Sequence, residues 1–189
     1  VTTINQDNYF MDDSDERHIL IPELNHHNYD IPSSVLFDDL VKTVRDIIDE
    51  QCSDSRRKLI LIDGNMIFEN DELVKLIDLK YYLDHPFDRI LQIRTFRSYE
   101  PPDPPKYFVD YVWPAHVKYL EHAKSIPDLR IIDRIEYNTN FQEILIDILR
   151  RLYHDEWYHV TEQKLCLQLA TEFVRDENCG AISTFSGEH

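Results

Sequence analysis

Glycine is scarce in this chain: of its 189 residues, only Gly64, Gly180 and Gly187 are glycines. The phosphate-binding loop of P-loop enzymes requires the pattern G-x-x-x-x-G-K-[ST], and dinucleotide-binding folds require G-x-G-x-x-G. A serine nucleophile elbow also needs two glycines close together. Three isolated glycines satisfy none of these patterns, so the 189 residues contain no glycine-rich loop for phosphates and no serine elbow.

Cysteines and basic residues are also few. The three cysteines lie far apart, and an odd number without a C-x-x-C pair argues against a disulfide framework. A reduced, cytoplasmic protein is the simpler expectation. The 20 Lys and Arg stand against 36 Asp and Glu, and a net charge of -16 disfavours nucleic acid or an anionic membrane as the partner. No apolar run approaches the length of a membrane span, and the oligomeric state is left open.

The hydrophobic patterns predict strands that alternate with helices. The aliphatic run at 59–62 predicts a strand buried on both faces of a parallel sheet. Shorter runs predict strands at 1–4, 81–84 and 129–133. Helices are predicted at 36–48, after an N-cap from Ser33-Ser34, and at 71–78, 86–97, 107–119, 141–152 and about 160–175.

This order of elements is typical of an α/β fold with a mostly parallel, doubly wound sheet flanked by helices. Residues 11–33 and the proline-rich stretch 98–106 are predicted to be loops. We expect one α/β domain over 1–153, followed by a C-terminal helical extension and tail over 154–189.

Aspartates follow four of the predicted strands. Ligands of open α/β sheets bind outside the carboxyl ends of the strands, where a carboxylate can hold Mg²⁺ or accept a proton. The alternative is that each Asp caps the next turn. Capping is favoured for Asp84 and Asp133, and a functional role is favoured for Asp7 and Asp63.

Arginines recur along the predicted helix that runs into the proline-rich stretch, namely Arg89, Arg94 and Arg97. Arginines on a closing lid can neutralise a transferring phosphoryl group, and a solvated helical face is the equally weighted alternative. The stretch also satisfies P-x-x-P, but a role as an SH3-type ligand is disfavoured between two predicted core helices.

Four motifs together resemble one known family. The longest is RTFRSYEPPDPPKYFVDYVWPAHVKY at 94–119; the others are Gln6-Asp7-Asn8-Tyr9-Phe10, Asn28-Tyr29-Asp30 and LILIDGNMIF at 59–68. In this order, and over about residues 4–145, the chain resembles the nicotinamide riboside kinases, which are relatives of uridine kinase among the P-loop kinases.

The resemblance implies phosphorylation of the 5′-hydroxyl of nicotinamide riboside, a step of NAD biosynthesis, with Mg²⁺ and with ATP as co-substrate. Asp7 would act as the general base or hydroxyl-orienting group, and Asp7 and Asp63 would support the metal. A lid at about 94–106 would close on the substrate, with Arg97 and Thr95 near the nucleotide phosphates. The substrate-binding residues implied are Asn8, Tyr9, Phe10, Tyr29, Asp30, Arg94, Tyr99 and Glu100.

The chain also departs from the family pattern. The family's first strand and P-loop are expected to precede Val1, so these 189 residues alone are expected to be inactive. Gln92 and Ile93 stand where the family usually has arginines, and Asp63 stands where it commonly has Glu. Two alternatives therefore stay open: a non-catalytic pseudokinase or binding protein, and a kinase for another riboside such as uridine.

Overall fold

The computed structural model of the chain describes residues 1–50, 59–132 and 137–152. By its internal contacts the chain divides into two units, Val1–Arg134 and Ile135–His189. The second unit is described through helix α5 (Tyr137–Leu152), which confirms the helix predicted at 141–152. Asp133, the helix expected near 160–175 and the extension at 154–189 lie outside the described residues.

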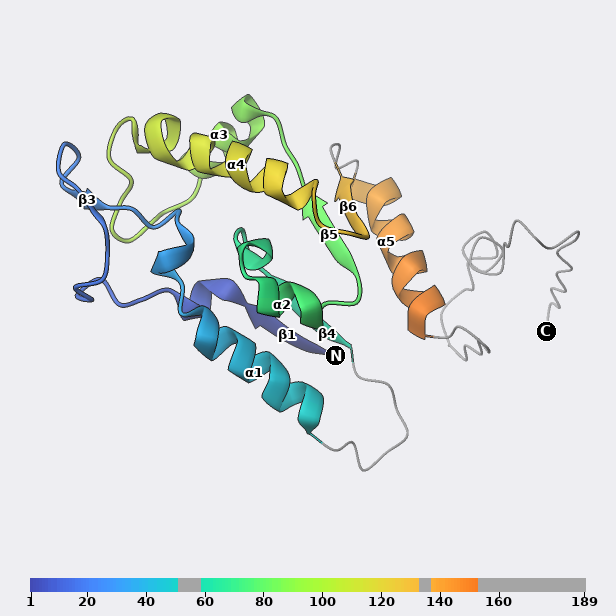
Figure 1. Ribbon diagram of the computed structural model, residues 1–189. Helices are drawn as coiled ribbons and strands as arrows, with labels where there is room; N and C mark the ends of the chain where they lie inside the picture. Colours follow the sequence, from blue (N-terminus) through green and yellow to red (C-terminus); the bar gives the residue numbers. More distant parts are fainter. Residues whose placement is uncertain (51–58, 133–136, 153–189) are drawn as a thin grey trace, which may run out of the picture. The chain divides into compact units, whose positions relative to one another are not determined.

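Parallel strand pairs form the sheet part of the first unit. Strand β1 (Thr2–Asn5) pairs with β4 (Ile60–Asp63), and β5 (Lys80–Leu83) pairs with β6 (Leu129–Ile132), both in parallel register. These pairs, which Figure 1 shows among the helices, confirm the predicted α/β class. Among the described residues the strands form separate two-stranded sheets and do not join into one doubly wound sheet.

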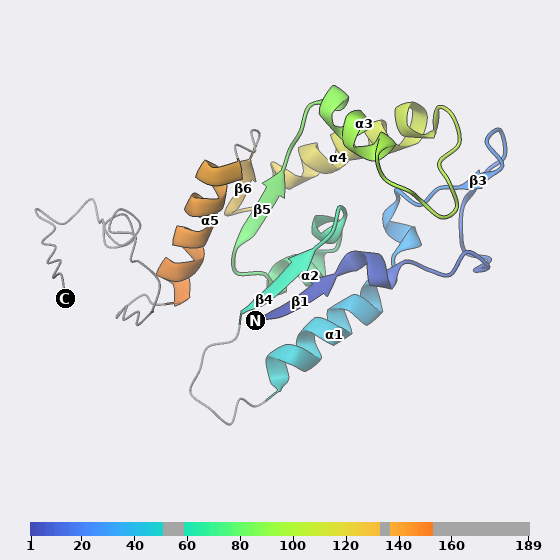
Figure 2. The ribbon, with the colours of Figure 1, turned by 180° about the vertical axis from the view of Figure 1, so that it is seen from behind.

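The helices of the first unit lie where the apolar periodicity predicted them. They are α1 (Phe37–Asp49), α2 (Asp71–Leu76), α3 (Phe87–Thr95) and α4 (Trp113–Ala123), and a π-helical turn (Phe108–Val112) runs into α4. Short 3-10 turns cover Gln6–Tyr9, Pro32–Ser34 and Ile67–Glu69. Seen from both sides in Figures 1 and 2, α3 and α4 are joined by the long proline-rich loop.

Three local predictions were wrong. The stretch 11–33 contains an antiparallel hairpin of two-residue strands, β2 (Leu20–Ile21) and β3 (His26–His27). Ser34 does not cap α1, because its buried hydroxyl donates to the carbonyl of Asn28. Strand β4 is not buried on both faces, because Leu61 is 41 % exposed.

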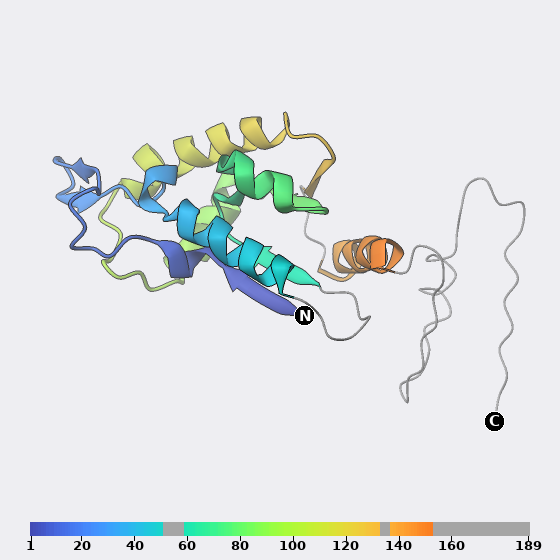
Figure 3. The same ribbon diagram turned by 60° about the horizontal axis from the view of Figure 1, so that its bottom comes forward.

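The main hydrophobic core joins helices and strands of the first unit. Helix α1 contributes Leu40, Val41 and Val44, all at helical spacing and all buried. They pack with residues of β1, the 3-10 turn at Ile67–Glu69, α2, β5 and α4. Figure 3 agrees with Figure 1 in placing α2 between α1 and α4. Burial of aliphatic side chains on this scale is the main stabilising contribution to the unit.

A second, smaller hydrophobic cluster lies around the hairpin and the proline-rich loop. Its buried members are Ile21, Tyr107, Phe108 and Val112. Residues of α3, including Phe87 and Ile90, pack against it. The hairpin, α3 and the π-helical turn are therefore held together independently of the main core, and this cluster supports the candidate site described next.

Candidate functional site

Asp7 and Asp63 lie at the carboxyl ends of two neighbouring parallel strands. The register of the pair aligns Asn5 with Asp63, and Asp7 follows two residues later. The Asn5 side chain accepts a 2.9 Å hydrogen bond from the backbone N–H of Asp7, which fixes the turn that leaves β1. Both carboxylates are exposed, so they can reach a ligand at this edge.

An amide clamp, formed by Gln6, Asn65 and the backbone of Met66, ties these two strand ends together. Gln6 is fully buried; its Nε2 donates to Asn65 Oδ1, and its Oε1 accepts from the Met66 N–H, both at 2.9 Å. The sequence reasoning missed this role, although Gln6 stands in the Q-D motif. The clamp sets the spacing between the segments that carry Asp7 and Asp63.

Glycine is required at position 64 because the backbone there lies directly against the Gln6 side chain. A Cβ atom added at Gly64 would lie 2.4 Å from Cβ of Gln6, which a flexible side chain cannot relieve. We expect Gly64→Ala to lower the free energy of unfolding by about 1–3 kcal/mol, as overpacking does. Urea unfolding measures this, with Asp63→Ala as the control because the Asp63 side chain is exposed. Equal stability of the two variants would contradict the expectation.

The segment after Asp7 runs beside the segment after Asp30. Phe10 bridges to Val35, the Leu36 N–H donates to the Tyr9 carbonyl at 2.7 Å, and the Met11 N–H donates to the Ser34 carbonyl at 3.0 Å. The Gln6–Phe10 motif is thereby held next to the segment that follows the Asn28-Tyr29-Asp30 motif. Tyr9 and Phe10 pack partly against the main core and Asn8 is exposed, so their role in lining a pocket stays a prediction.

Arg94 connects three of the predicted site residues. Its Nη2 lies 3.5 Å from Oδ2 of Asp30, and its guanidinium lies over the ring of Tyr99, 4.6 Å from the centroid. Asp103 holds the same guanidinium in a bidentate pair, at 2.5 Å from Nε and 3.2 Å from Nη2. Asp103 lies within the proline-rich motif, yet the sequence reasoning gave it no role.

The electrostatics of this group favour a ligand that donates hydrogen bonds or carries positive charge. Asp30 is 9 % exposed, and its burial raises the pKa of its carboxyl above the ordinary value, while Arg94 opposes that change. Asp30 and Asp103 share the single guanidinium of Arg94. When all three side chains are ionised, they carry a net negative charge together. A cis-diol can donate to Asp30, and a flat cationic ring is attracted to aromatic faces nearby.

Tyr29 lies in a cluster of histidine rings from the hairpin region. The rings of His18, His26 and His27 have centroids 5.2, 5.3 and 6.1 Å from that of Tyr29. The Tyr29 hydroxyl donates to Asp13 at 2.9 Å. Sequence analysis placed His26-His27 in a polar loop, whereas the structure buries His26 between Tyr29 and Tyr107.

Because of His26, we expect the free energy of unfolding to decrease in mild acid. Its burial lowers the pKa of the imidazole below the ordinary value of 6.5, so the unfolded chain binds protons that the folded chain does not. The free energy of unfolding is therefore expected to decrease as the pH falls below about 6.5. His26→Phe keeps an aromatic ring and removes the titration, and it should flatten the pH dependence of the thermal midpoint between pH 7 and 5. An unchanged slope in this variant would contradict the assignment.

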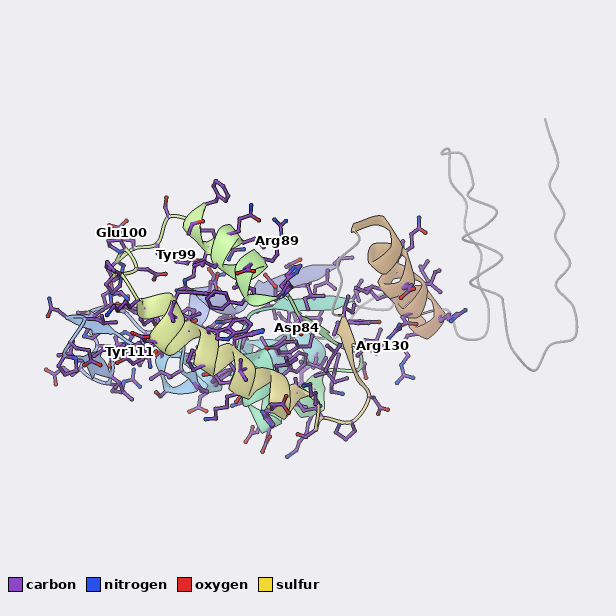
Figure 4. All side chains as sticks on the ribbon, turned by 90° about the horizontal axis from the view of Figure 1, so that it is seen from above. Asp84, Arg89, Tyr99, Glu100, Tyr111 and Arg130 are labelled. Carbon is purple, nitrogen blue, oxygen red and sulfur yellow. The ribbon has the colours of Figure 1, made fainter. Side chains whose placement is uncertain are left out.

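Among the described residues, the other lid residues predicted for the site make no contact with the guanidinium of Arg94. The Thr95 hydroxyl donates to the Gln92 carbonyl at 2.7 Å within its own helix, and Arg97 and Glu100 are exposed. Figure 4 shows Tyr99 and Glu100 together on the loop after α3, with Asp84 and Arg130 toward the opposite end of the unit. Their contacts to substrate or phosphates stay predictions.

Asp84 neither caps a helix nor joins the other carboxylates. Its Oδ1 lies 3.2 Å from Nε2 of His116 on α4, and the helix that follows begins without a side-chain cap. Within the described ranges no three His, Cys, Asp or Glu side chains gather as a metal site. Asp7 and Asp63 as a pair still suit Mg²⁺, which commonly takes one or two carboxylates and completes its shell with water and phosphate oxygens.

Comparisons with known proteins agree with the motifs. The chain is 32 % identical over 98 residues to nicotinamide riboside kinase 1 of Rattus norvegicus, covering 51 % of this chain and 47 % of that protein. It is 30 % identical over 112 residues to nicotinamide riboside kinase 1 of Homo sapiens, covering 59 % and 52 %. It is 27 % identical over 116 residues to the uridine kinase of Chlamydia pneumoniae, covering 57 % and 52 %.

No protein-family profile matches the chain. None of the described helices has the length and apolar character needed to cross a membrane. The chain spans about half the length of the curated relatives it matches. The resemblance drawn from the sequence motifs is thereby confirmed: this chain is similar to nicotinamide riboside kinases and to a uridine kinase.

Proposed function

We propose that these residues form the substrate-binding part of a kinase that phosphorylates the 5′-hydroxyl of nicotinamide riboside with ATP. The observation that carries the proposal is the group of Asp30, Arg94 and Tyr99, which two separate motifs implicated and in which Arg94 contacts both Asp30 and Tyr99. A buried carboxylate beside aromatic rings suits a riboside that carries a cationic base. The names of the relatives support the same substrate class.

Each element of the site has a role in this proposal. Asp30 accepts hydrogen bonds from ribose hydroxyls, and Tyr29 and Tyr99 contact the base. Asp7, at the exposed end of β1, accepts the proton of the 5′-hydroxyl. Asp63, across the register from Asn5, supports Mg²⁺ together with Asp7. Arg97 and Thr95 approach the phosphates when the lid closes.

The nucleotide phosphates need groups beyond the present residues, because no glycine-rich loop can be written in them. The two parallel strand pairs support the proposal of a larger sheet, since parallel strands are normally buried within sheets of several strands. One further parallel strand between β4 and β5 would join the pairs and bring a phosphate-binding loop to the edge that carries Asp7 and Asp63.

Riboside binding without turnover is the second candidate function. It is favoured by Gln92 and Ile93 on α3, which stand where the family usually has arginines. In this case the Asp30 group would bind nicotinamide riboside, but no phosphate would be transferred from ATP. Uridine remains an alternative substrate, because a uridine kinase is among the relatives.

Calorimetric titration of the 189-residue chain with nicotinamide riboside, uridine and free nicotinamide tests the binding part of the proposal. We expect nicotinamide riboside to bind most tightly and free nicotinamide least, because the latter lacks the ribose. Phosphoryl transfer is measured separately in a longer chain that carries a phosphate-binding loop. Preference for uridine would change the substrate, and absence of binding to either riboside would refute the proposal.

A further inference from the structure

Tyr107 joins the proline-rich loop to the segment that carries the predicted riboside-binding residues. Its side chain is fully buried, although it lies directly after the lid. Lys106 has a positive φ of 73°, and the Tyr107 N–H donates to the Pro104 carbonyl at 3.1 Å. This tight turn directs the tyrosine inward, toward residues nearly 80 positions earlier in the chain.

The Tyr107 hydroxyl is the centre of a small hydrogen-bond network. It accepts from the backbone N–H of Tyr29 at 2.9 Å and of Asp30 at 3.3 Å. It lies 3.0 Å from Oδ2 of Asp30 and 3.4 Å from Oδ1 of Asn28. Because a hydroxyl has one proton, it can donate to only one of these oxygens, and the shorter contact with a carboxylate is favoured.

These contacts decide which oxygen of Asp30 can meet a ligand. Tyr107 donates to Oδ2, and Arg94 approaches the same oxygen. Within the described part of the chain Oδ1 accepts no hydrogen bond, so it is the oxygen left for a ligand donor. A residue that only filled space would need the ring alone, whereas here the hydroxyl satisfies two backbone donors and one carboxylate.

We propose that Tyr107 is a positioning residue for riboside recognition: its hydroxyl fixes Tyr29 and Asp30 so that Oδ1 of Asp30 faces the ribose hydroxyls. This inference rests on the proposed riboside site. Tyr107 does not touch the reacting atoms, and it acts through Asp30. Arg94 lies over the same ring, 5.7 Å from its centroid, so lid and ribose-binding segment share one anchor.

Tyr107→Phe removes the hydroxyl and keeps the ring, and Tyr111→Phe is the matched control. The Tyr111 ring stacks on that of Tyr107 with centroids 5.9 Å apart, but its hydroxyl donates to Glu23 at the surface. We expect Tyr107→Phe to weaken binding of nicotinamide riboside about tenfold to a hundredfold, as expected for loss of a hydrogen bond to a charged group. Binding of free nicotinamide should change less than twofold, and Tyr111→Phe should alter neither.

Amide hydrogen exchange provides a measurement that needs no ligand. The Tyr29 amide should exchange at least about tenfold faster in Tyr107→Phe, because it loses the Tyr107 hydroxyl as its acceptor, whereas the Asp30 amide keeps Oδ1 of Asn28 at 3.2 Å as a second acceptor. Exchange of the Tyr29 amide should be unchanged in Tyr111→Phe. Unchanged exchange of the Tyr29 amide, or unaltered riboside affinity in a folded Tyr107→Phe chain, would overturn the positioning role. If the unsubstituted chain binds no riboside while the exchange result is obtained, the proposed function fails and the anchoring of Asp30 by Tyr107 stands.

Discussion

Asp30→Asn is expected to stabilise the ligand-free chain and to weaken riboside binding at least about a hundredfold. Burial raises the pKa of the Asp30 carboxyl, so its ionised form is disfavoured in the folded state. Asparagine has nearly the same shape and carries no charge, so it avoids that cost at neutral pH. The same change removes the charge that accepts the ribose hydroxyls, and hydrogen bonds to charged groups contribute more than neutral ones.

The sign of the stability change can be checked against pH. A carboxyl whose pKa is raised on folding contributes its full stability below its unfolded value, near 3.8, and loses it as the pH rises through the folded value. The advantage of Asp30→Asn in the free energy of unfolding should therefore be small near pH 4 and grow toward pH 7. For a chain of this size each kcal/mol raises the thermal midpoint by about 2–4 °C.

Asp103→Asn is the matched control, because it removes the other carboxylate that faces Arg94. Asp103 forms the bidentate pair with the guanidinium, so its loss leaves the half-buried Arg94 with the longer 3.5 Å contact to Asp30 as its remaining ion pair among the described residues. We expect this variant to lower the thermal midpoint, opposite to Asp30→Asn. Thermal unfolding followed by circular dichroism, with calorimetric titration of the riboside, measures both effects. A lower midpoint for Asp30→Asn, or an unchanged riboside affinity, would contradict the assignment.

Asp7→Asn is expected to reduce phosphoryl transfer by about 10²–10⁴-fold in a longer chain that carries a phosphate-binding loop. Asparagine cannot accept the proton of the 5′-hydroxyl. The substitution should leave the fold intact, since the side chain is exposed and the hydrogen bond at this position uses the backbone N–H of Asp7. Affinity for the riboside should change little, because the ribose is held by Asp30.

Steady-state kinetics at saturating ATP separates these outcomes. A fall in kcat with an unchanged KM for the riboside supports a role for Asp7 in the chemical step. Asp84→Asn serves as the control, because Asp84 contacts His116 and has no role in the proposed chemical step. Retention of kcat within tenfold in Asp7→Asn would exclude a role as general base. A longer chain that binds riboside without any turnover would favour the second candidate function.

Local patterns predicted the regular elements of this chain well. The spacing of the apolar residues Leu40, Val41 and Val44 predicts α1, because residues at this spacing lie on one face of a helix and that face must be buried. The hairpin of β2 and β3 was missed, since strands of two residues are too short to show any periodicity. Ser34 was misread as a cap, because its hydroxyl is taken by the Asn28 carbonyl in a contact that no local pattern reveals.

The candidate site was likewise predicted in part from the sequence and missed in part. The resemblance pointed to Asp30, Arg94 and Tyr99, and the structure brings them together. Gln6 and Tyr107 were missed because their partners lie 59 to 79 positions away, and sequence spacing does not indicate such pairs. Tyr107 and Asp103 nevertheless belong to the motif at 94–119, so its unusual length was the available signal that further residues of this motif contact the site.

The amide clamp has a consequence for the conditions under which the site forms. Gln6, Asn65 and the Met66 N–H are all uncharged, so ionic strength does not screen their hydrogen bonds as it screens ion pairs. The clamp also contains no group that titrates in the physiological range. The strand ends that carry Asp7 and Asp63 are therefore held at their spacing before any cation arrives, in dilute buffer and in concentrated salt alike.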